Sequence, residues 1–151
     1  MWRNWQFISG VLKIIFRHPV IGVTLVPVLP NGKIVLVYRQ DTQQWSLPGG
    51  MVDWGEDILN TAQRELKEET GLDLIGMKRL IGVYSSPDRD PRLHSISILI
   101  EVEARGDMKV KDTWEIGEVR AFSPDEIPIG NLAHDHDRQL QDYLQGKTAI
   151  A

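Results

Sequence analysis

The chain has 151 residues, a hydrophobic content of 42 % and a formal net charge of −4, which together predict one soluble globular domain. The acidic balance argues against a general nucleic-acid binder, because such proteins present a basic surface to the phosphate backbone. The sequence contains no cysteine, which excludes disulfides and thiol catalysis and suits a cytoplasmic location.

The first 16 residues, MWRNWQFISGVLKIIF, place apolar side chains near helical spacing. This segment is too short to span a bilayer, which takes about 20 apolar residues, and no small-residue cleavage site follows it. We therefore expect residues 1–18 to be an amphipathic extension that packs on its own domain or on a second copy of the chain in a homodimer. Contact between the basic side chains of residues 1–17 and a membrane surface is the alternative.

Two β-strands joined by a turn are predicted after this extension. Residues 19–28 form an apolar, β-branched run that is typical of a buried strand. Pro30-Asn31-Gly32 is a turn signal, and residues 33–39 predict a second strand, so the two strands should form a hairpin. A polar loop over residues 41–44 then leads to a glycine-rich segment that ends at Gly49-Gly50.

Residues 56–70 predict an amphipathic helix. Gly71 directly follows this segment and suits the left-handed backbone position that ends many helices. The residues expected to form the buried stripe of the helix are Ile58, Leu59, Ala62 and Leu66.

Three carboxylates share one face of this helix, because Glu65, Glu68 and Glu69 stand at positions i, i+3 and i+4. Crowded carboxylates repel one another unless a cation lies among them, and hard oxygen ligands favour Mg²⁺ or Mn²⁺. The spacing therefore predicts a metal site on a rigid helix. The alternative is an ordinary surface helix with a solvated acidic face.

The rest of the chain predicts three more strands and a final helix. The expected bounds are residues 77–84, 95–103 and 118–122 for the strands and 137–144 for the helix. The side chains expected to face inward from that helix are Leu140, Tyr143 and Leu144. Strands interleaved with helices predict an α/β fold, in which helices cover both faces of a mixed sheet.

Residues 50–72, GMVDWGEDILNTAQRELKEETGL, resemble the Nudix box, the signature G-x5-E-x7-R-E-U-x-E-E-x-G-U in which U is a bulky aliphatic residue. The residues that fill its defined positions are Gly50, Glu56, Arg64, Glu65, Leu66, Glu68, Glu69, Gly71 and Leu72. The resemblance implies a Nudix-like α/β/α sandwich around a mixed β-sheet over residues 19–146, followed by a C-terminal tail at residues 147–151.

By this resemblance the chain should hydrolyse the pyrophosphate bond of a nucleoside diphosphate linked to another moiety, with Mg²⁺ or Mn²⁺ as cofactor. The resemblance implies that Glu65 and Glu69 are metal ligands, and that Glu68 is a ligand or holds a water molecule on the metal. Backbone carbonyls of Gly49 or Gly50 should complete the ligand set, since glycine allows a close approach.

The resemblance also implies groups that support the site or move a proton. Glu56 and Arg64 should form an ion pair that fixes the loop against the helix. In many relatives a glutamate ahead of the last strand takes the proton from water, and Glu115 and Glu118 are the candidates. We favour Glu115 over Glu118 and over a base within the helix, such as Glu68. The alternative is that Glu115 and Glu118 are both solvated loop charges.

The loop over residues 86–92 resembles the substrate loop of ADP-ribose pyrophosphatases, because Pro87 and the nearby arginines stand at similar positions. Arg89 and Arg92 are the candidates to bind phosphate or ribose through bidentate hydrogen bonds, and Arg39 is a further candidate phosphate contact. The structural alternative is a proline-stiffened turn with salt-bridged arginines.

These features favour cleavage of ADP-ribose or a related nucleoside diphosphate sugar to AMP and a sugar phosphate. The expected partner is thus a small nucleotide. One alternative is hydrolysis of oxidised or non-standard nucleoside triphosphates. A second alternative is a Nudix-fold sensor that binds a nucleotide without cleaving it, against which the complete set of helix glutamates argues.

His134 and His136 are flanked by aspartates, a composition that metal sites share. Residues two apart diverge on a helix or a strand, however, and zinc sites usually supply further ligands. We therefore expect Asp135 or Asp137 to cap the final helix, rather than a metal ion bound between the two histidines.

Overall fold

The computed structural model describes residues 8, 10, 12, 18–111 and 113–151. Most of the predicted N-terminal extension therefore lies outside the described residues, and so do its expected packing and the alternative of membrane contact. The elements in chain order are β1 (Val20–Val28), β2 (Ile34–Arg39), β3 (Gln44–Ser46), β4 (Gly49–Met51), α2 (Ile58–Thr70), β5 (Asp73–Tyr84), the 3-10 turn η1 (Pro87–Arg89), β6 (Ser95–Arg105), β7 (Ile116–Phe122), the 3-10 turn η2 (Pro124–Glu126), α3 (His136–Leu144) and β8 (Ala149–Ile150). Within this part of the chain, no helix is long and apolar enough to cross a membrane.

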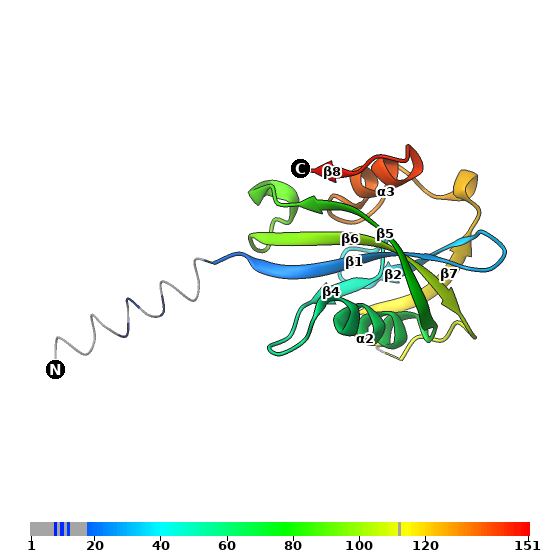
Figure 1. The fold of residues 1–151 in the computed structure, drawn as a ribbon, viewed down its shortest axis with the longest axis horizontal. Coiled ribbons are helices and arrows are strands. Elements are labelled where there is room, and N and C mark those ends of the chain that lie inside the picture. The colour runs from blue at the N-terminus through cyan, green and yellow to red at the C-terminus, as the bar shows by residue number, and fades with distance from the viewer. Residues whose placement is uncertain (1–7, 9, 11, 13–17, 112) are drawn as a thin grey trace.

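A mixed sheet forms the middle layer, with α2 on one face and α3 on the other (Figure 1). Its strand order is β3-β2-β1-β6-β5-β8, and β4 and β7 pair with β1 and β2. The parallel pairing of β1 with β6 begins at Val20 opposite Ser95, so the loop that precedes β6 lies beside the start of β1. This arrangement confirms the α/β/α sandwich around a mixed sheet.

β1 and β2 pair as the predicted hairpin only next to the turn, where Val28 lies opposite Ile34. Nearer the start of β1, its antiparallel partner is β4, with Gly22 opposite Met51 and Thr24 opposite Gly49. β2 pairs instead with β3 and β7. The glycine-rich segment is therefore a strand in contact with the centre of the sheet.

Two hydrophobic cores lie on opposite faces of the sheet, because successive side chains of a strand point to opposite faces. Leu25 and Ile100 belong to the core under α2, while their neighbours Val26 and Leu99 belong to the core under α3. A buried strand that contributes side chains to both cores has apolar residues at nearly every position, as residues 20–28 do.

Helix α2 begins two residues later than predicted. The carboxylate of Asp57 caps it by accepting a hydrogen bond from the Asn60 N–H at 2.8 Å, and Gly71 ends it at φ 77°. Ala62 and Leu66 are buried as expected, but Leu59 in the first turn is 48 % exposed, so that part of the prediction was wrong. Thr61, fully buried, completes the packed face instead.

The C-terminal part of the chain also differs from the sequence prediction in detail. Leu140 is buried in the core under α3, but Leu144 is 43 % exposed because it lies in the last turn of the helix. Residues 147–151 contain β8, which pairs in parallel with β5 (Gly82 opposite Ala149). β3, β4 and β8 each have two or three residues, too few for a periodic pattern to reveal.

His136, the first residue of α3, connects this helix to the strand segment that leads into the glycines. Its Nδ1 accepts a hydrogen bond from the Leu47 N–H at 3.1 Å. Burial lowers the pKa of His136 to about 3, and the neighbouring His134 and Arg89 lower it further. The imidazole is therefore neutral in the folded protein and charged in the unfolded chain below its ordinary pKa of 6.5.

Because the unfolded chain binds a proton at His136 that the folded protein excludes, stability should be lost as the pH falls below 6.5. The expected contribution is about 2 kcal/mol less free energy of unfolding at pH 5 than at pH 7.5. Urea unfolding across this range should show a shallower pH dependence in His136→Asn, whose amide oxygen still accepts from Leu47. The control His94→Asn, at an exposed histidine, should keep the wild-type slope, and an unchanged slope in His136→Asn would contradict the account.

Candidate active site

A cavity of about 400 Å³ opens between the glycine strand, the loop before β6 and the start of α3. Ligand sites usually fall in this size range. Glu65 of α2 and Glu115, one residue before β7, line it. Arg92 and His134 line it as well, so acidic and basic side chains border one space.

Two glutamates of α2 lie directly against the glycine strand. The Gly49 N–H donates a hydrogen bond to Oε2 of Glu69 at 3.0 Å. A Cβ added at Gly50 would stand 2.1 Å from Oε1 of Glu65, and one added at Gly49 would stand 2.1 Å from the Val23 carbonyl oxygen. Only glycine allows this approach of backbone to carboxylate.

Burial acts on the protonation of both carboxylates. Burial raises the pKa of Glu69 to about 8, and the charges of Glu65 and Glu115 raise it further. Burial likewise raises the pKa of Glu65. Glu68 differs from both, because its side chain is half exposed and lies 3.6 Å from Nη1 of Arg64. The three helix glutamates are thus placed at different depths.

Among the described residues, no three histidine, aspartate or glutamate side chains already converge as a metal cage. The carboxylates are bonded elsewhere, since Arg64 donates to Glu65 at 2.7 Å and Gly49 donates to Glu69. The available donors are nevertheless oxygens, from the buried Glu69 and the partly buried Glu65 beside the Gly49-Gly50 backbone. Such a set fits a hard divalent cation.

Arg64 clamps the loop after β4 to α2. Its Nε and Nη2 bind the two oxygens of Glu56 at 2.8 and 2.9 Å, and Nη2 also donates to the Met51 carbonyl at 3.2 Å. The hydrogen bond from Arg64 lowers the pKa of Glu56 to about 2, and the Thr61 hydroxyl assists. This pair fixes the loop without lining the cavity.

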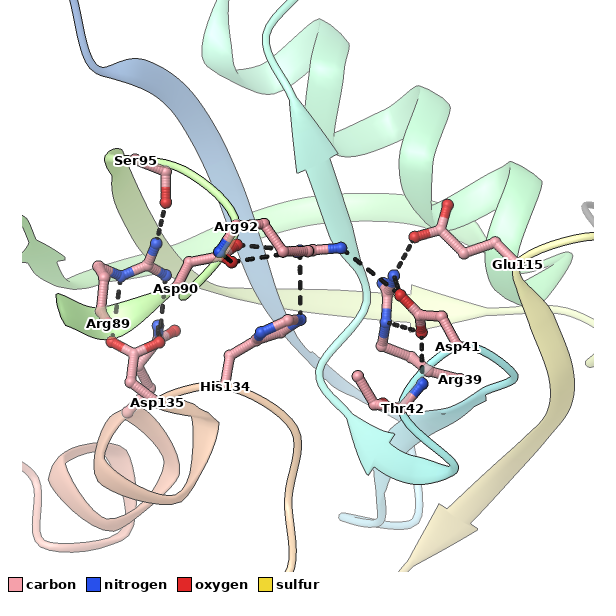
Figure 2. A network of polar contacts seen from close by, with 11 residues as sticks. Arg39, Asp41, Thr42, Arg89, Asp90, Arg92, Ser95, Glu115, His134 and Asp135 are labelled. Atoms are coloured by element: carbon pink, nitrogen blue, oxygen red, sulfur yellow. Dashed lines mark hydrogen bonds and ion pairs between the residues drawn. The ribbon is translucent and has the colours of Figure 1, made fainter. Parts of the chain in front are cut away.

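The structure brings Glu115, and not Glu118, to the cavity. Glu115 forms an ion pair with Arg39, which also lines the cavity (Figure 2). Glu118 lies along β7 opposite Tyr38, and its carboxylate binds Arg120. Glu118 therefore does not line the cavity in this structure, and its candidacy as a base stays a prediction.

The guanidinium of Arg89 is fixed by contacts within the protein. Its guanidinium binds both oxygens of Asp135 at 3.1 and 3.2 Å and also donates to Ser95 (Figure 2). The side chain is only 8 % exposed, although it borders the cavity. Pro87 is exposed in η1 and is not among the residues that line the cavity, so it shapes the turn.

Arg92 is the more accessible arginine of the loop, with 51 % of its side chain exposed. Its Nε and Nη2 bind the two oxygens of Asp90 at 3.0 and 2.9 Å. Nη2 also lies 3.4 Å from Nε2 of His134, and Nη1 lies 3.5 Å from Oδ2 of Asp41. The guanidinium faces the cavity, where it can meet an anionic ligand.

The sequence predicted that Asp135 or Asp137 caps the final helix, but neither carboxylate accepts a capping hydrogen bond from α3. Asp135 occupies the position before α3, but its carboxylate makes no capping hydrogen bond and pairs with Arg89 instead. Asp137 accepts from the Gly130 N–H at 2.6 Å and so fixes the preceding loop. Sequence reasoning also missed Asp41 and Asp90, each two residues from the arginine that it binds, a spacing that signals such a pair.

Comparison with known proteins places this geometry in a family. The family model described as the NUDIX domain matches residues 18–143. The chain is 38 % identical over 137 residues to an ADP-ribose pyrophosphatase of Methanocaldococcus jannaschii, an alignment that covers 88 % of this chain and 78 % of that protein. It is 31 % identical over 125 residues to a Bacillus subtilis protein provisionally named an 8-oxo-dGTP diphosphatase, covering 83 % and 80 %.

Among solved structures, the NUDIX domain of Shewanella oneidensis NrtR, in complex with ADP ribose, superposes with a TM-score of 0.77. The match covers 93 % of this chain and 96 % of that one at 19 % identity, so this likeness shows the fold alone. The family model and the relative at 38 % identity show family membership as well as fold, because both span most of the chain and include the helix glutamates. The chain therefore belongs to the NUDIX family and is a NUDIX pyrophosphohydrolase.

Proposed function

We propose that this enzyme cleaves the pyrophosphate bond of ADP-ribose or a related nucleoside diphosphate sugar, giving AMP and a sugar phosphate. One observation carries the proposal: a cavity of about 400 Å³ is lined by Glu65, by Gly49, whose N–H binds Glu69, and by the accessible Arg92. A pyrophosphate that bridges two sugars needs both a cation site and a cationic side chain. The similarity to an ADP-ribose pyrophosphatase supports this substrate class.

The donor set suits Mg²⁺ or Mn²⁺, which when bound neutralises phosphate oxygens and makes phosphorus open to attack. Glu65 and Glu69 would hold the ion together with a backbone carbonyl of Gly49 or Gly50. Glu68, at the exposed side of the same helix, would hold a water molecule or a further ion. Arg64 would release or share Glu65 while keeping Glu56, so the loop stays fixed.

Glu115 is the proposed general base. It lines the cavity together with Glu65 of α2, and there it takes the proton from the attacking water. Arg39 binds this carboxylate and keeps it directed into the cavity. Arg92 orients the substrate by binding a phosphate or a ribose hydroxyl, whereas Arg89 holds the loop in place through Asp135.

The test is release of AMP from a substrate panel with Mg²⁺ or Mn²⁺ present, in water labelled with heavy oxygen. The proposal requires AMP and ribose phosphate from ADP-ribose, and the label identifies the phosphorus attacked. Preferential cleavage of oxidised nucleoside triphosphates would favour the alternative that the Bacillus subtilis relative suggests. Binding of ADP-ribose without any product would indicate a sensor.

Replacing Glu69 with Gln should retain the fold, since the amide oxygen still accepts from Gly49. The loss of an anionic ligand should raise the barrier by about 3–5 kcal/mol, or roughly 10²–10⁴ in kcat. Steady-state kinetics of Glu69→Gln beside Glu126→Gln, an exposed glutamate in η2, checks this. Near-normal turnover in folded Glu69→Gln would remove α2 as the metal site.

Replacing Gly50 with Ala should lower kcat on the order of 100-fold, because displacing a ligand by about 1 Å has effects of that size. The new Cβ would stand 2.1 Å from Oε1 of Glu65, a flexible carboxylate that moves before the backbone does. The matched control is Gly76→Ala on β5, where an added Cβ meets nothing within 4 Å. Equal activity in both variants would show that the Gly50–Glu65 contact is dispensable.

The two loop arginines should respond differently to replacement by Ala. Arg92→Ala should raise KM for ADP-ribose about tenfold to a hundredfold, because a bidentate contact contributes about 1.5–3 kcal/mol. Arg89→Ala should instead lower the free energy of unfolding by about 3 kcal/mol, since it leaves Asp135 unpaired. Kinetics on ADP-ribose and on an unrelated cleavable nucleotide, with urea unfolding, separate these effects. Equal losses on both substrates in Arg92→Ala would remove the case for ADP-ribose selection.

A further inference from the structure

We propose that Asp41 is a positioning residue for the reaction, which holds the guanidinium of Arg39 in the orientation that directs Glu115 into the cavity. This inference rests on the proposed function, in which Glu115 takes the proton from water. Asp41 itself lies outside the cavity lining and touches no candidate metal ligand that the structure describes.

The contacts of Asp41 fix Arg39 in two directions at once. Oδ1 accepts from Nε of Arg39 and Oδ2 accepts from Nη2, each at 2.9 Å, which is a bidentate pair in one plane. The Thr42 N–H donates to Oδ1 at 2.9 Å and so holds the carboxylate itself. The same Nη2 binds Glu115 (Figure 2). Asp41 therefore determines where the shared donor points.

The backbone near Glu115 is held independently of Asp41. The Gln40 N–H donates to the carbonyl of Glu115 at 2.9 Å, and Arg39 pairs with Ile116 across the two strands. The side chain of Gln40 also donates to the Thr113 carbonyl at 2.9 Å. Loss of the Asp41 carboxylate should consequently change the direction of the Arg39 and Glu115 side chains without releasing the segment.

One guanidinium is shared between two carboxylates in this cluster. The Arg39 side chain is only 10 % exposed, so it has few water partners and must satisfy its donors within the protein. Without Asp41, Glu115 is the remaining carboxylate partner of Arg39 in this contact set, and a bidentate pair with it becomes the favoured geometry. Both oxygens of Glu115 would then face Arg39 rather than the attacking water.

Substrate binding should be spared by this change. Arg92 lies 3.5 Å from Oδ2 of Asp41, which is a weak contact, whereas its bidentate pair with Asp90 has distances of 2.9 and 3.0 Å. The loop arginine therefore keeps its main partner when Asp41 is replaced. A split between kcat and KM distinguishes positioning of Glu115 from binding of substrate.

The experiment is a double-mutant cycle with ADP-ribose as substrate, using wild type, Asp41→Asn, Glu115→Gln and the double variant. Asp41→Asn should lower kcat about 10- to 100-fold with KM within about twofold, since misplacing a base forfeits part of its 10²–10⁴ contribution. The same replacement in the Glu115→Gln background should cause no further loss. Asp125→Asn, at an exposed aspartate of η2, controls for removal of one negative charge and should match wild type.

Three results would overturn the inference: wild-type kcat in Asp41→Asn, an equal loss with and without Glu115, or a loss confined to KM. Asp41→Ser, which removes the carboxylate from the same half-exposed turn, repeats the test, and circular dichroism establishes that each variant is folded. Failure of the proposed function is distinguishable. In that case wild type releases no AMP from ADP-ribose, or Glu115→Gln turns over as fast as wild type.

Discussion

The site depends on two carboxylates that the fold holds away from water. Glu65 and Glu69 lie against Gly49-Gly50, and burial raises the pKa of both side chains. Arg64 compensates the charge of Glu65, whereas Glu69 is buried with the Gly49 N–H as its donor, an arrangement that is costly and persists only where the surrounding packing is rigid. Ala62 and Leu66 fix α2 in one core, and pairing with β1 fixes the glycine strand. Neither element can move away to relieve the repulsion.

Arginines pair with several carboxylates around this centre, and the arginine side chains differ in how far they are buried. Arg64 and Arg89 each hold a carboxylate with two donors, and both therefore fix backbone segments. Arg92 makes a bidentate pair as well, but half of its side chain faces solvent and the cavity. Since a paired guanidinium retains unused N–H donors, exposure rather than pairing determines which arginine can meet a ligand.

Local patterns in the sequence predicted most of the fold, helix α2 included, because strand and helix periodicity and the end signal Gly71 act over a few residues. Partners distant in sequence were not predictable in the same way. Arg39 and Glu115 are 76 residues apart, and Arg89 and Asp135 are 46 apart, so their meeting depends on strand order. The exposure of Leu59 likewise depends on where the sheet lies beneath the first turn of α2.

In the proposed mechanism, chemistry and substrate choice reside on different elements of this fold. Helix α2 and the glycine strand are neighbours in sequence, whereas the loop of residues 86–92 reaches the cavity because β6 runs parallel to β1 from the same edge. A change of loop would then alter selection without disturbing Glu65 or Glu69. The described contacts between the two parts run through Arg92, Asp41 and Arg39 to Glu115, a chain of charged groups at the cavity edge. In the proposed mechanism, this chain joins the group that orients the substrate to the group that takes the proton, and its weakest contact is the one of 3.5 Å between Arg92 and Asp41.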